Sequence, residues 1–311
     1  MAWNRKVKAV DEDFGSCTVV EEKFVTNHPA EIFGYHIGNT TIEAREVRHK
    51  HWCPFMETGC IKTSRSIDYP LGVCTIVHDG MFYAICSHRF EGKGSIEGVP
   101  LALENIALHH FGNLTDIVTF SDVKLPNYGA INFVIARHKP FKAEIEDFVP
   151  VELRAISPAG TAQLVQSIND FMAGVNISNQ TYHMGINIDR TIRRFLAEVL
   201  DKGIVYETWG IKSYWVIQEY IYANLVKRYG LKQEGFSTED ASRFALQDFT
   251  PNGDRIKLQT TRYVSVSVDE IYQVMRNDSG LPSKTRFIAA LNDRLKRTIE
   301  LGIRNKIRLK L

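Results

Sequence analysis

The sequence predicts a mixed α/β (α+β) protein. Three runs with alternating apolar and polar residues predict neighbouring strands at 115–123, 130–137 and 148–156. Apolar residues at helical spacing surround these strands. Helices are predicted at 100–111, 162–172, 189–202, 214–229 and 283–303. Residues before 100 indicate short strands and loops, with a hairpin around His78-Asp79-Gly80.

These patterns divide the chain into three units. Residues 1–99 form a small strand and loop module, and residues 100–175 form a helix followed by a meander of strands. Residues 176–311 form a helical half that completes the middle unit. Since chains of about 300 residues often contain more than one domain, a division of this kind fits the length.

Composition indicates an ordinary soluble protein. The chain has 311 residues, of which 44% are hydrophobic and 24% are charged. Its apolar runs are far shorter than the roughly 20 residues that span a bilayer, so no membrane segment is expected. The N-terminus has no apolar signal region, and we therefore expect a cytoplasmic protein.

The net charge of +2 neither favours nor excludes a nucleic acid partner. The chain nevertheless ends in a basic stretch between Arg294 and Lys310, in which Glu300 is the only acid. This stretch is either a solvated helix face or a surface that contacts phosphates.

Four of the five cysteines lie close together in the sequence and are candidate metal ligands. In a reducing compartment such cysteines bind metals more often than they form disulfides. Their spacing lacks the short C-x2-C pair of zinc fingers, so scattered core cysteines remain the alternative. The four are Cys53, Cys60, Cys74 and Cys86. Nearby histidines that could replace one ligand are His51, His78 and His88.

The third predicted strand carries a carboxylate and a cation on one face. Side chains alternate along a strand, so Glu152 and Arg154 share one face while Val151 and Leu153 share the other. Metal-dependent phosphodiester hydrolysis needs carboxylates that converge from adjacent strands, with a cationic or polar group beside them. Asp122 and Asn132, on the two preceding strands, are positioned to join Glu152 and Arg154 in one pocket. The alternative is the solvated face of an ordinary sheet.

Three blocks in this order resemble the catalytic core of Type II restriction endonucleases similar to NotI. They are Phe120–Pro126, Gly129–Ile135 and Phe148–Ile156, with the four cysteines upstream and residues 184–188 and 203–214 downstream. The resemblance implies a PD-(D/E)xK nuclease core and a homodimer that cuts double-stranded DNA at a palindromic site. It also implies a magnesium cofactor and a structural iron or zinc ion held by the four cysteines.

Carried over by position, Asn132 stands where the family has a metal-binding aspartate and Glu152 matches the second carboxylate. Arg154 stands where lysine or glutamine is usual, and Asp122 matches an upstream acid. The resemblance thus implies magnesium ligands at Asp122, Asn132 and Glu152. Asparagine brings no charge, so we expect weaker magnesium binding, and arginine stays protonated and cannot act as a base.

Three explanations fit Asn132: an engineered substitution, natural degeneration, or a variant site in which Asp122 and Glu152 hold the metal. The first is favoured because asparagine is nearly isosteric with aspartate. The alternative function is a non-catalytic, sequence-specific DNA-binding protein on a degenerate nuclease scaffold. A metal-stabilised interaction module without a nucleic acid partner is a further alternative.

Candidate DNA contacts are cations on the predicted helix after Asp189 and on the flanking segments. Phosphate contacts of this kind fix the orientation of a protein on DNA rather than its sequence preference. The alternative is a helix with cations facing water. The candidates are Lys124, Arg190, Arg193, Arg194 and Lys212, with Lys202 between them.

Overall fold

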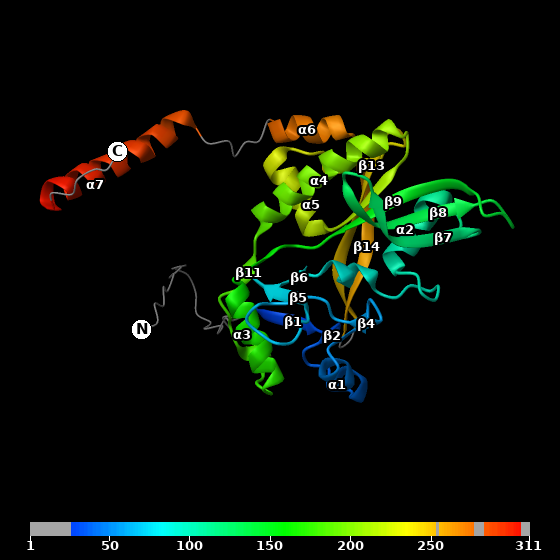
Figure 1. Ribbon diagram of the computed structural model, residues 1–311, viewed down its shortest axis with the longest axis horizontal. Coiled ribbons are helices and arrows are strands. Elements are labelled where there is room, and N and C mark those ends of the chain that lie inside the picture. Colours follow the sequence, from blue (N-terminus) through cyan, green and yellow to red (C-terminus); the bar gives the residue numbers. More distant parts are fainter. Residues whose placement is uncertain (1–25, 253–254, 277–282, 306–311) are drawn as a thin grey trace, which may run out of the picture.

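The computed structural model describes residues 26–252, 255–276 and 283–305 and confirms a mixed α/β fold (Figure 1). The α-helices in these ranges are α1 (Ile42–His49), α2 (Leu101–Phe111), α3 (Thr161–Met172), α4 (Ile188–Thr208), α5 (Glu219–Tyr229), α6 (Val268–Arg276) and α7 (Lys284–Asn305). Two short 3-10 helices are η1 (Ser87–Glu91) and η2 (Ile177–Asn179). None of the described helices combines the length and apolar character needed to cross a bilayer.

A six-stranded sheet forms the centre of the larger part of the molecule. Its order is β14-β13-β12-β9-β8-β7, in which β12 runs parallel to β9 and β13 while the other neighbours are antiparallel. The strands are β7 (Ile117–Leu125), β8 (Gly129–His138), β9 (Ile145–Arg154), β12 (Ser213–Gln218), β13 (Ser242–Asn252) and β14 (Arg255–Val266). The predicted meander corresponds to β7, β8 and β9.

Helices cover both faces of this sheet. Phe195 of α4 contacts Trp215 of β12 edge to face at 5.8 Å between ring centroids, and Tyr222 of α5 contacts Phe244 of β13 at 5.6 Å. On the opposite face, Ile106 of α2 belongs to a second buried cluster with Val151. The central strands therefore lie between two apolar layers, which fixes the direction of every side chain on them.

The helix predicted over 214–229 is wrong in its first part. Residues Ser213–Gln218 form β12, and all six are buried. A parallel central strand is covered on both faces, so its sequence is a continuous apolar run instead of an alternating one. Such a run cannot be distinguished from a buried helical segment by periodicity alone. The remainder of the prediction agrees with α5, which ends at Gly230, a left-handed residue with φ 73°.

The prediction that residues 176–311 form a helical half is also wrong. Between α4 and α7 the chain contributes β12, β13 and β14 to the sheet, so this half is mixed. The sheet therefore draws strands from both sides of the boundary predicted at residue 175.

The N-terminal module contains a separate four-stranded sheet of order β2-β1-β5-β6. Its strands are β1 (His28–Ile32), β2 (Tyr35–His36), β5 (Val73–His78) and β6 (Met81–Ala84). The predicted hairpin is confirmed: β5 pairs with β6 through Asp79 and Gly80, which have φ values of 50° and 77°. Small two-stranded pairs are β3 (Trp52–Cys53) with β4 (Thr58–Gly59), and β10 (Pro158–Ala159) with β11 (Gly185–Ile186). Residues 1–25 of the predicted module lie outside the described residues.

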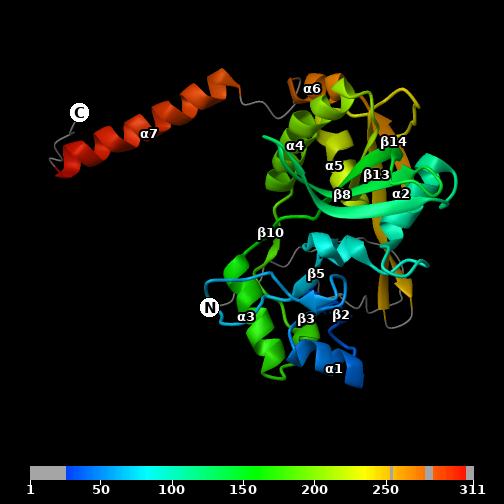
Figure 2. The same cartoon turned by 45° about the vertical axis from the view of Figure 1, so that its right-hand side comes forward.

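The buried side chain of Gln218 joins this module to the large sheet. Its Nε2 donates to the Phe82 carbonyl oxygen at 2.6 Å, and its Oε1 accepts from the Ala84 N–H at 3.2 Å. Figure 2 shows the module, with α1 and α3 around its strands, lying beneath the larger sheet. Since a buried amide must satisfy both its donor and its acceptor, this contact fixes how β12 meets β6.

His110 predicts a pH dependence of stability. His110 lies on α2 beside Tyr214 of β12 and Arg243 of β13, and its burial there lowers its pKa from the ordinary value. The Asp147 carboxylate at 3.3 Å opposes that shift, and Arg243 adds to it. Because the pKa of this histidine is lower in the folded protein than in the unfolded chain, the unfolded chain binds a proton first as pH falls. The protein therefore loses stability as pH falls through the ordinary pKa of histidine. We expect His110→Gln to flatten the fall in unfolding free energy between pH 7.5 and 5.5, by at most about 1.4 kcal/mol per pH unit. Urea titrations at pH 7.5 and pH 5.5 measure the unfolding free energies, and His183→Gln, at an exposed histidine, is the control. An equal change of unfolding free energy with pH in the two variants would contradict the role of His110.

Candidate functional site

A row of polar side chains on helix α4 points towards the six-stranded sheet. The helix begins after Asn187, whose side chain accepts a hydrogen bond from the Arg190 N–H at 2.9 Å. Residues four apart lie on one face of a helix. The row consists of Arg194, Glu198, Lys202 and Tyr206, which run from the exposed rim of the helix into the interior.

A buried ion pair between Lys202 and Glu152 lies at the centre of the candidate site. The Lys202 Nζ donates to Glu152 Oε1 at 2.5 Å and to the Ala130 carbonyl oxygen at 2.6 Å. The same Nζ lies 3.3 Å from Glu198 Oε1. Glu152 is 1% exposed and Lys202 is 5% exposed. The expectation that Glu152 and Arg154 share a face opposite Val151 is confirmed, whereas the alternative of a solvated face is wrong for Glu152.

The electrostatics of Glu152 reflect its burial. Desolvation raises the pKa of its carboxyl group, and the hydrogen bond from Lys202 and the charge of Arg154 oppose that rise. Burial, and after it the Glu152 carboxylate, raise the pKa of Tyr206. Buried ion pairs are costly to desolvate and seldom increase stability over apolar packing, and perturbed carboxyl groups cluster at functional sites. These properties favour a functional role for the pair.

Asn132 of β8 lies opposite Glu152 of the neighbouring strand β9. Phe133 pairs with Val151, so the next residues in each direction, Asn132 and Glu152, face each other on one side of the sheet. The Asn132 Oδ1 accepts a hydrogen bond from the Leu153 N–H at 2.9 Å. Its carbonyl oxygen is therefore already bound to the backbone of β9.

Asp122 lies across from Asn132 on β7. Ser121 pairs with Phe133 and Val123 pairs with Ile131, which leaves Asp122 between them. Its φ of 51° is in the left-handed region, and its side chain is exposed. The register thus places Asp122 level with Asn132, but its left-handed φ interrupts the alternation of β7, so its side chain is not directed to the face of Glu152 by strand geometry. Burial increases from Asp122 to Glu152, towards the centre of the sheet.

Arg154 is ion-paired with Glu198 of α4. Burial lowers its pKa, and the Glu152 carboxylate opposes that shift. Two carboxylates, Glu152 and Glu198, and two cations, Arg154 and Lys202, are therefore interleaved between β9 and α4. Opposite charges in this arrangement compensate the desolvation of each other.

A surface hollow of about 740 Å³ opens beside this cluster. Asn127 and Tyr128 of the turn between β7 and β8, with Gly129 and Ala130 at the start of β8, form one wall. Arg194, Ala197, Glu198, Asp201 and Lys202 of α4 form the other. Glu198 and Lys202 border the hollow, whereas Glu152 lies behind Lys202 and is not part of the lining.

The structure separates the predicted DNA contacts. Arg190, Arg193 and Arg194 are exposed within about one turn of α4, and Arg194 lines the hollow. Lys124 is exposed on β7. Lys212 follows the other end of α4, about 30 Å away at 1.5 Å per residue, and its Nζ donates to the Glu239 carbonyl oxygen at 2.8 Å.

The four predicted cysteine ligands line one small cavity of about 20 Å³ in the N-terminal module. Cys53 lies on β3, Cys60 follows β4, Cys74 lies on β5 and Cys86 precedes η1. All four are free thiols, and burial raises the pKa of Cys53, Cys74 and Cys86. His88 lines the same cavity. Among the described residues, no three or more His, Cys, Asp or Glu side chains are arranged closely enough to form a metal-binding group.

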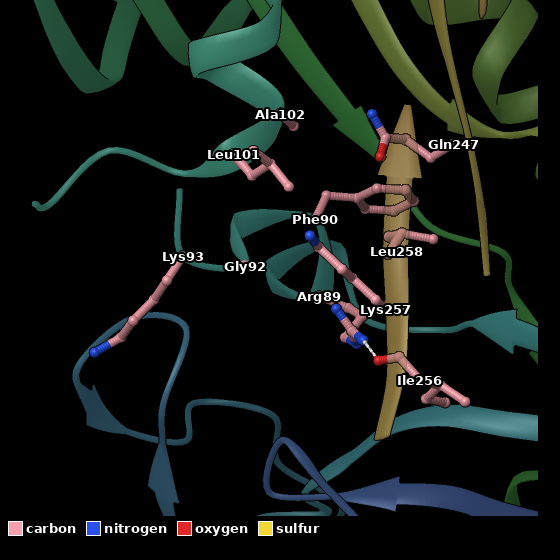
Figure 3. A pocket seen from close by; sticks show the side chains of 10 residues that line it. All are labelled: Arg89, Phe90, Gly92, Lys93, Leu101, Ala102, Gln247, Ile256, Lys257 and Leu258. Carbon is pink, nitrogen blue, oxygen red and sulfur yellow. Dashed lines mark hydrogen bonds between the residues drawn. The ribbon is translucent and has the colours of Figure 1, made fainter. Parts of the chain in front are cut away.

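A second cavity, of about 210 Å³, lies between η1, the start of α2 and β14 (Figure 3). Arg89 there donates to the Ile256 carbonyl oxygen at 2.8 Å and pairs with the buried Glu31 carboxylate at 2.6 Å. Glu31 neutralises this buried cation, and Lys93 and Lys257 also line the cavity, whereas the hollow beside α4 adjoins the buried Glu152 and Lys202 pair. The hollow is therefore the stronger candidate site.

Glu198, Lys202 and Tyr206 were not predicted as parts of the central site. The available signal was their spacing of four residues on a predicted helix, with Glu198 and Lys202 as a potential ion pair. That signal also describes many exposed helices. Only the packing of α4 on the sheet shows that these side chains point inward.

No family model matches this chain, and no curated protein matches it. The candidate site is therefore interpreted from its own chemistry.

Proposed function

We propose that this protein is a magnesium-dependent endonuclease of the Type II restriction class, acting as a homodimer on double-stranded DNA at a specific palindromic site. The observation that carries the proposal is the buried Glu152 and Lys202 pair, opposite Asn132 and beside an open hollow lined by Arg194. Its proposed location is the cytoplasm, where thiols stay reduced.

In this proposal Glu152 holds magnesium together with Asp122 and position 132. Bound magnesium would neutralise charge on the scissile phosphate and lower the pKa of an attacking water. The Lys202 Nζ lies 2.5 Å from Glu152 Oε1, where its hydrogen bonds could stabilise charge that develops on the phosphate. Arg194, at the rim, would bind a neighbouring phosphate. Arg154 positions Glu198 instead of acting as a base.

The alternative is a DNA-binding protein on a degenerate nuclease scaffold. Two observations favour it: the Asn132 oxygen is bound to the Leu153 N–H, and the Glu152 carboxylate is bound to Lys202. Both oxygens would have to exchange these partners for a metal ion. An aspartate at position 132 would keep an oxygen for Leu153 and add a charged oxygen for magnesium.

The deciding experiment compares the protein with its Asn132→Asp variant on a diverse plasmid and on genomic DNA, in magnesium and in manganese. We expect the variant to cleave about 10²- to 10³-fold faster, because one restored metal ligand supplies several kcal/mol of charge stabilisation. If neither protein cleaves under any condition, the nuclease proposal fails. Salt-dependent binding to a random duplex would then support the DNA-binding alternative. If the protein does not bind the duplex either, the metal-stabilised interaction module is the function that remains.

We also propose that the four cysteines hold a structural iron or zinc ion. The support for this proposal is the cavity that all four side chains line, since cysteine sulfur is the usual ligand of structural zinc and iron. We expect about one metal ion per chain by elemental analysis, and its loss in a Cys74→Ser variant with reduced thermal stability. Cys17 is distant from the other four cysteines in the sequence and is not one of the predicted ligands, so Cys17→Ser is the control. An equal metal content in both variants would contradict the site.

A further inference from the structure

Helix α7 presents an apolar stripe that nothing in the described structure covers. Phe287, Ile288, Leu291 and Leu295 are between 44% and 62% exposed, and their spacing places them on one face. Figures 1 and 2 both show α7 extending away from α6 and from the sheet. A contiguous apolar face of this kind marks an interaction surface.

The rest of this helix is cationic. Between Lys284 and Arg297 the helix carries five cations and one acid, Asp293. An apolar stripe flanked by cations fits a partner surface that is apolar and acidic.

A surface with those properties lies on α4 and α6 of the same chain. The two helices pack together, and the Val268 N–H of α6 donates to Glu207 Oε1 of α4 at 2.9 Å. The large apolar side chains Ile204, Trp209 and Tyr272 are each at least half exposed on these helices or directly after them. The exposed acids beside these side chains, on the C-terminal half of α4 and on α6, are Asp201, Glu207 and Asp269, with Arg276 as an exposed cation at the end of α6. The exposed cations of α4 lie in its N-terminal half, which lies outside this surface.

We propose that α7 of each copy docks on the α4 and α6 surface of a second copy. Both surfaces are open within one chain, and α7 extends away from its own α4, so two chains can satisfy both pairs by two-fold exchange. The described side chains of α7, residues 284–297, extend over about 21 Å at a width of about 10 Å, so two such contacts bury roughly 800 Å² in total. That area fits a weak, micromolar dimer. The inference identifies the dimer contact of the proposed function, although its evidence does not depend on cleavage.

Sedimentation velocity on the full chain at micromolar concentration tests this contact. We expect a dimer for the parent protein and at least about 100-fold weaker association for the Leu291→Asp/Leu295→Asp variant, which places charges in the apolar stripe. Ala289→Asp, on the opposite face of α7, is the matched control and is expected to remain dimeric. Circular dichroism verifies that each variant is folded.

The Ile204→Asp variant separates this contact from other uses of α7. We expect this variant to be monomeric by itself but to form a heterodimer with the Leu291→Asp/Leu295→Asp variant. In that heterodimer the intact α7 of the first variant can dock on the intact α4 and α6 surface of the second, so one of the two contacts is retained. Direct pairing of two α7 helices predicts that Ile204→Asp remains a dimer. Docking of α7 on its own chain predicts a monomeric parent, and either result overturns the proposal. Because the readout is mass, its failure is distinguishable from a failure of the cleavage experiment.

Discussion

Replacing Glu152 by glutamine in the Asn132→Asp protein is expected to abolish magnesium-dependent cleavage of duplex DNA. Glutamine keeps the shape of the side chain but removes the buried charge that pairs with Lys202. In the proposed mechanism this carboxylate is the innermost metal ligand, and its loss removes several kcal/mol of charge stabilisation. We expect a decrease of about 10³-fold or more in the single-turnover rate.

Glu146→Gln is the matched control for this experiment. Glu146 lies on the same strand, β9, at a position of the same parity, but it is exposed. It should leave the cleavage rate unchanged. Binding to duplex DNA in calcium, an inert substitute for magnesium, should be retained in both variants, since phosphate contacts carry most of the affinity. Loss of binding together with loss of folding in Glu152→Gln would assign Glu152 a structural role instead.

Lys202→Met is expected to lower the free energy of unfolding by about 3–5 kcal/mol. The substitution leaves Glu152 buried without its closest cation, and removing one partner of a buried pair costs far more than the pair itself contributes. Lys50→Met is the control. Its ion pair with Glu46 is exposed, so a loss below about 1 kcal/mol is expected. Urea denaturation of the three proteins measures both effects.

The cost of Lys202→Met should depend on pH. Burial already raises the pKa of Glu152, and removing Lys202 removes the strongest opposing interaction. A raised folded pKa means that the folded protein binds more protons than the unfolded one, so stability falls as pH rises through that pKa. The loss should therefore be smaller at pH 5 than at pH 8. The double variant Glu152→Gln/Lys202→Met should recover part of it; equal losses in the single and double variants would contradict the coupling.

The meander of β7, β8 and β9 was predictable because local patterns dominate it. Each strand is long, its apolar residues alternate, and turns separate it from the next. The same patterns predicted that Glu152 and Arg154 share a face. The helices α2, α3 and α7 were predictable from their helical spacing within two residues of their observed ends, whereas α4 continues six residues beyond its predicted end at Lys202.

The strand β12 was not predictable from its own residues. Its six residues are all buried because β9 and β13 flank it and helices cover both faces. That environment depends on strands about 60 residues before it and about 30 residues after it. Periodicity within a short window contains no information about such neighbours.

The sequence by itself determined the mixed fold class, the strand meander and the candidate positions Asp122, Asn132, Glu152 and Arg154, because these depend on local periodicity and residue type. Only the tertiary structure decided that Lys202 and Glu198 join Glu152 between α4 and β9. It also decided that the four cysteines share one cavity. The physical reason is that a buried charge is defined by its neighbours, and those neighbours are brought together only when distant segments pack.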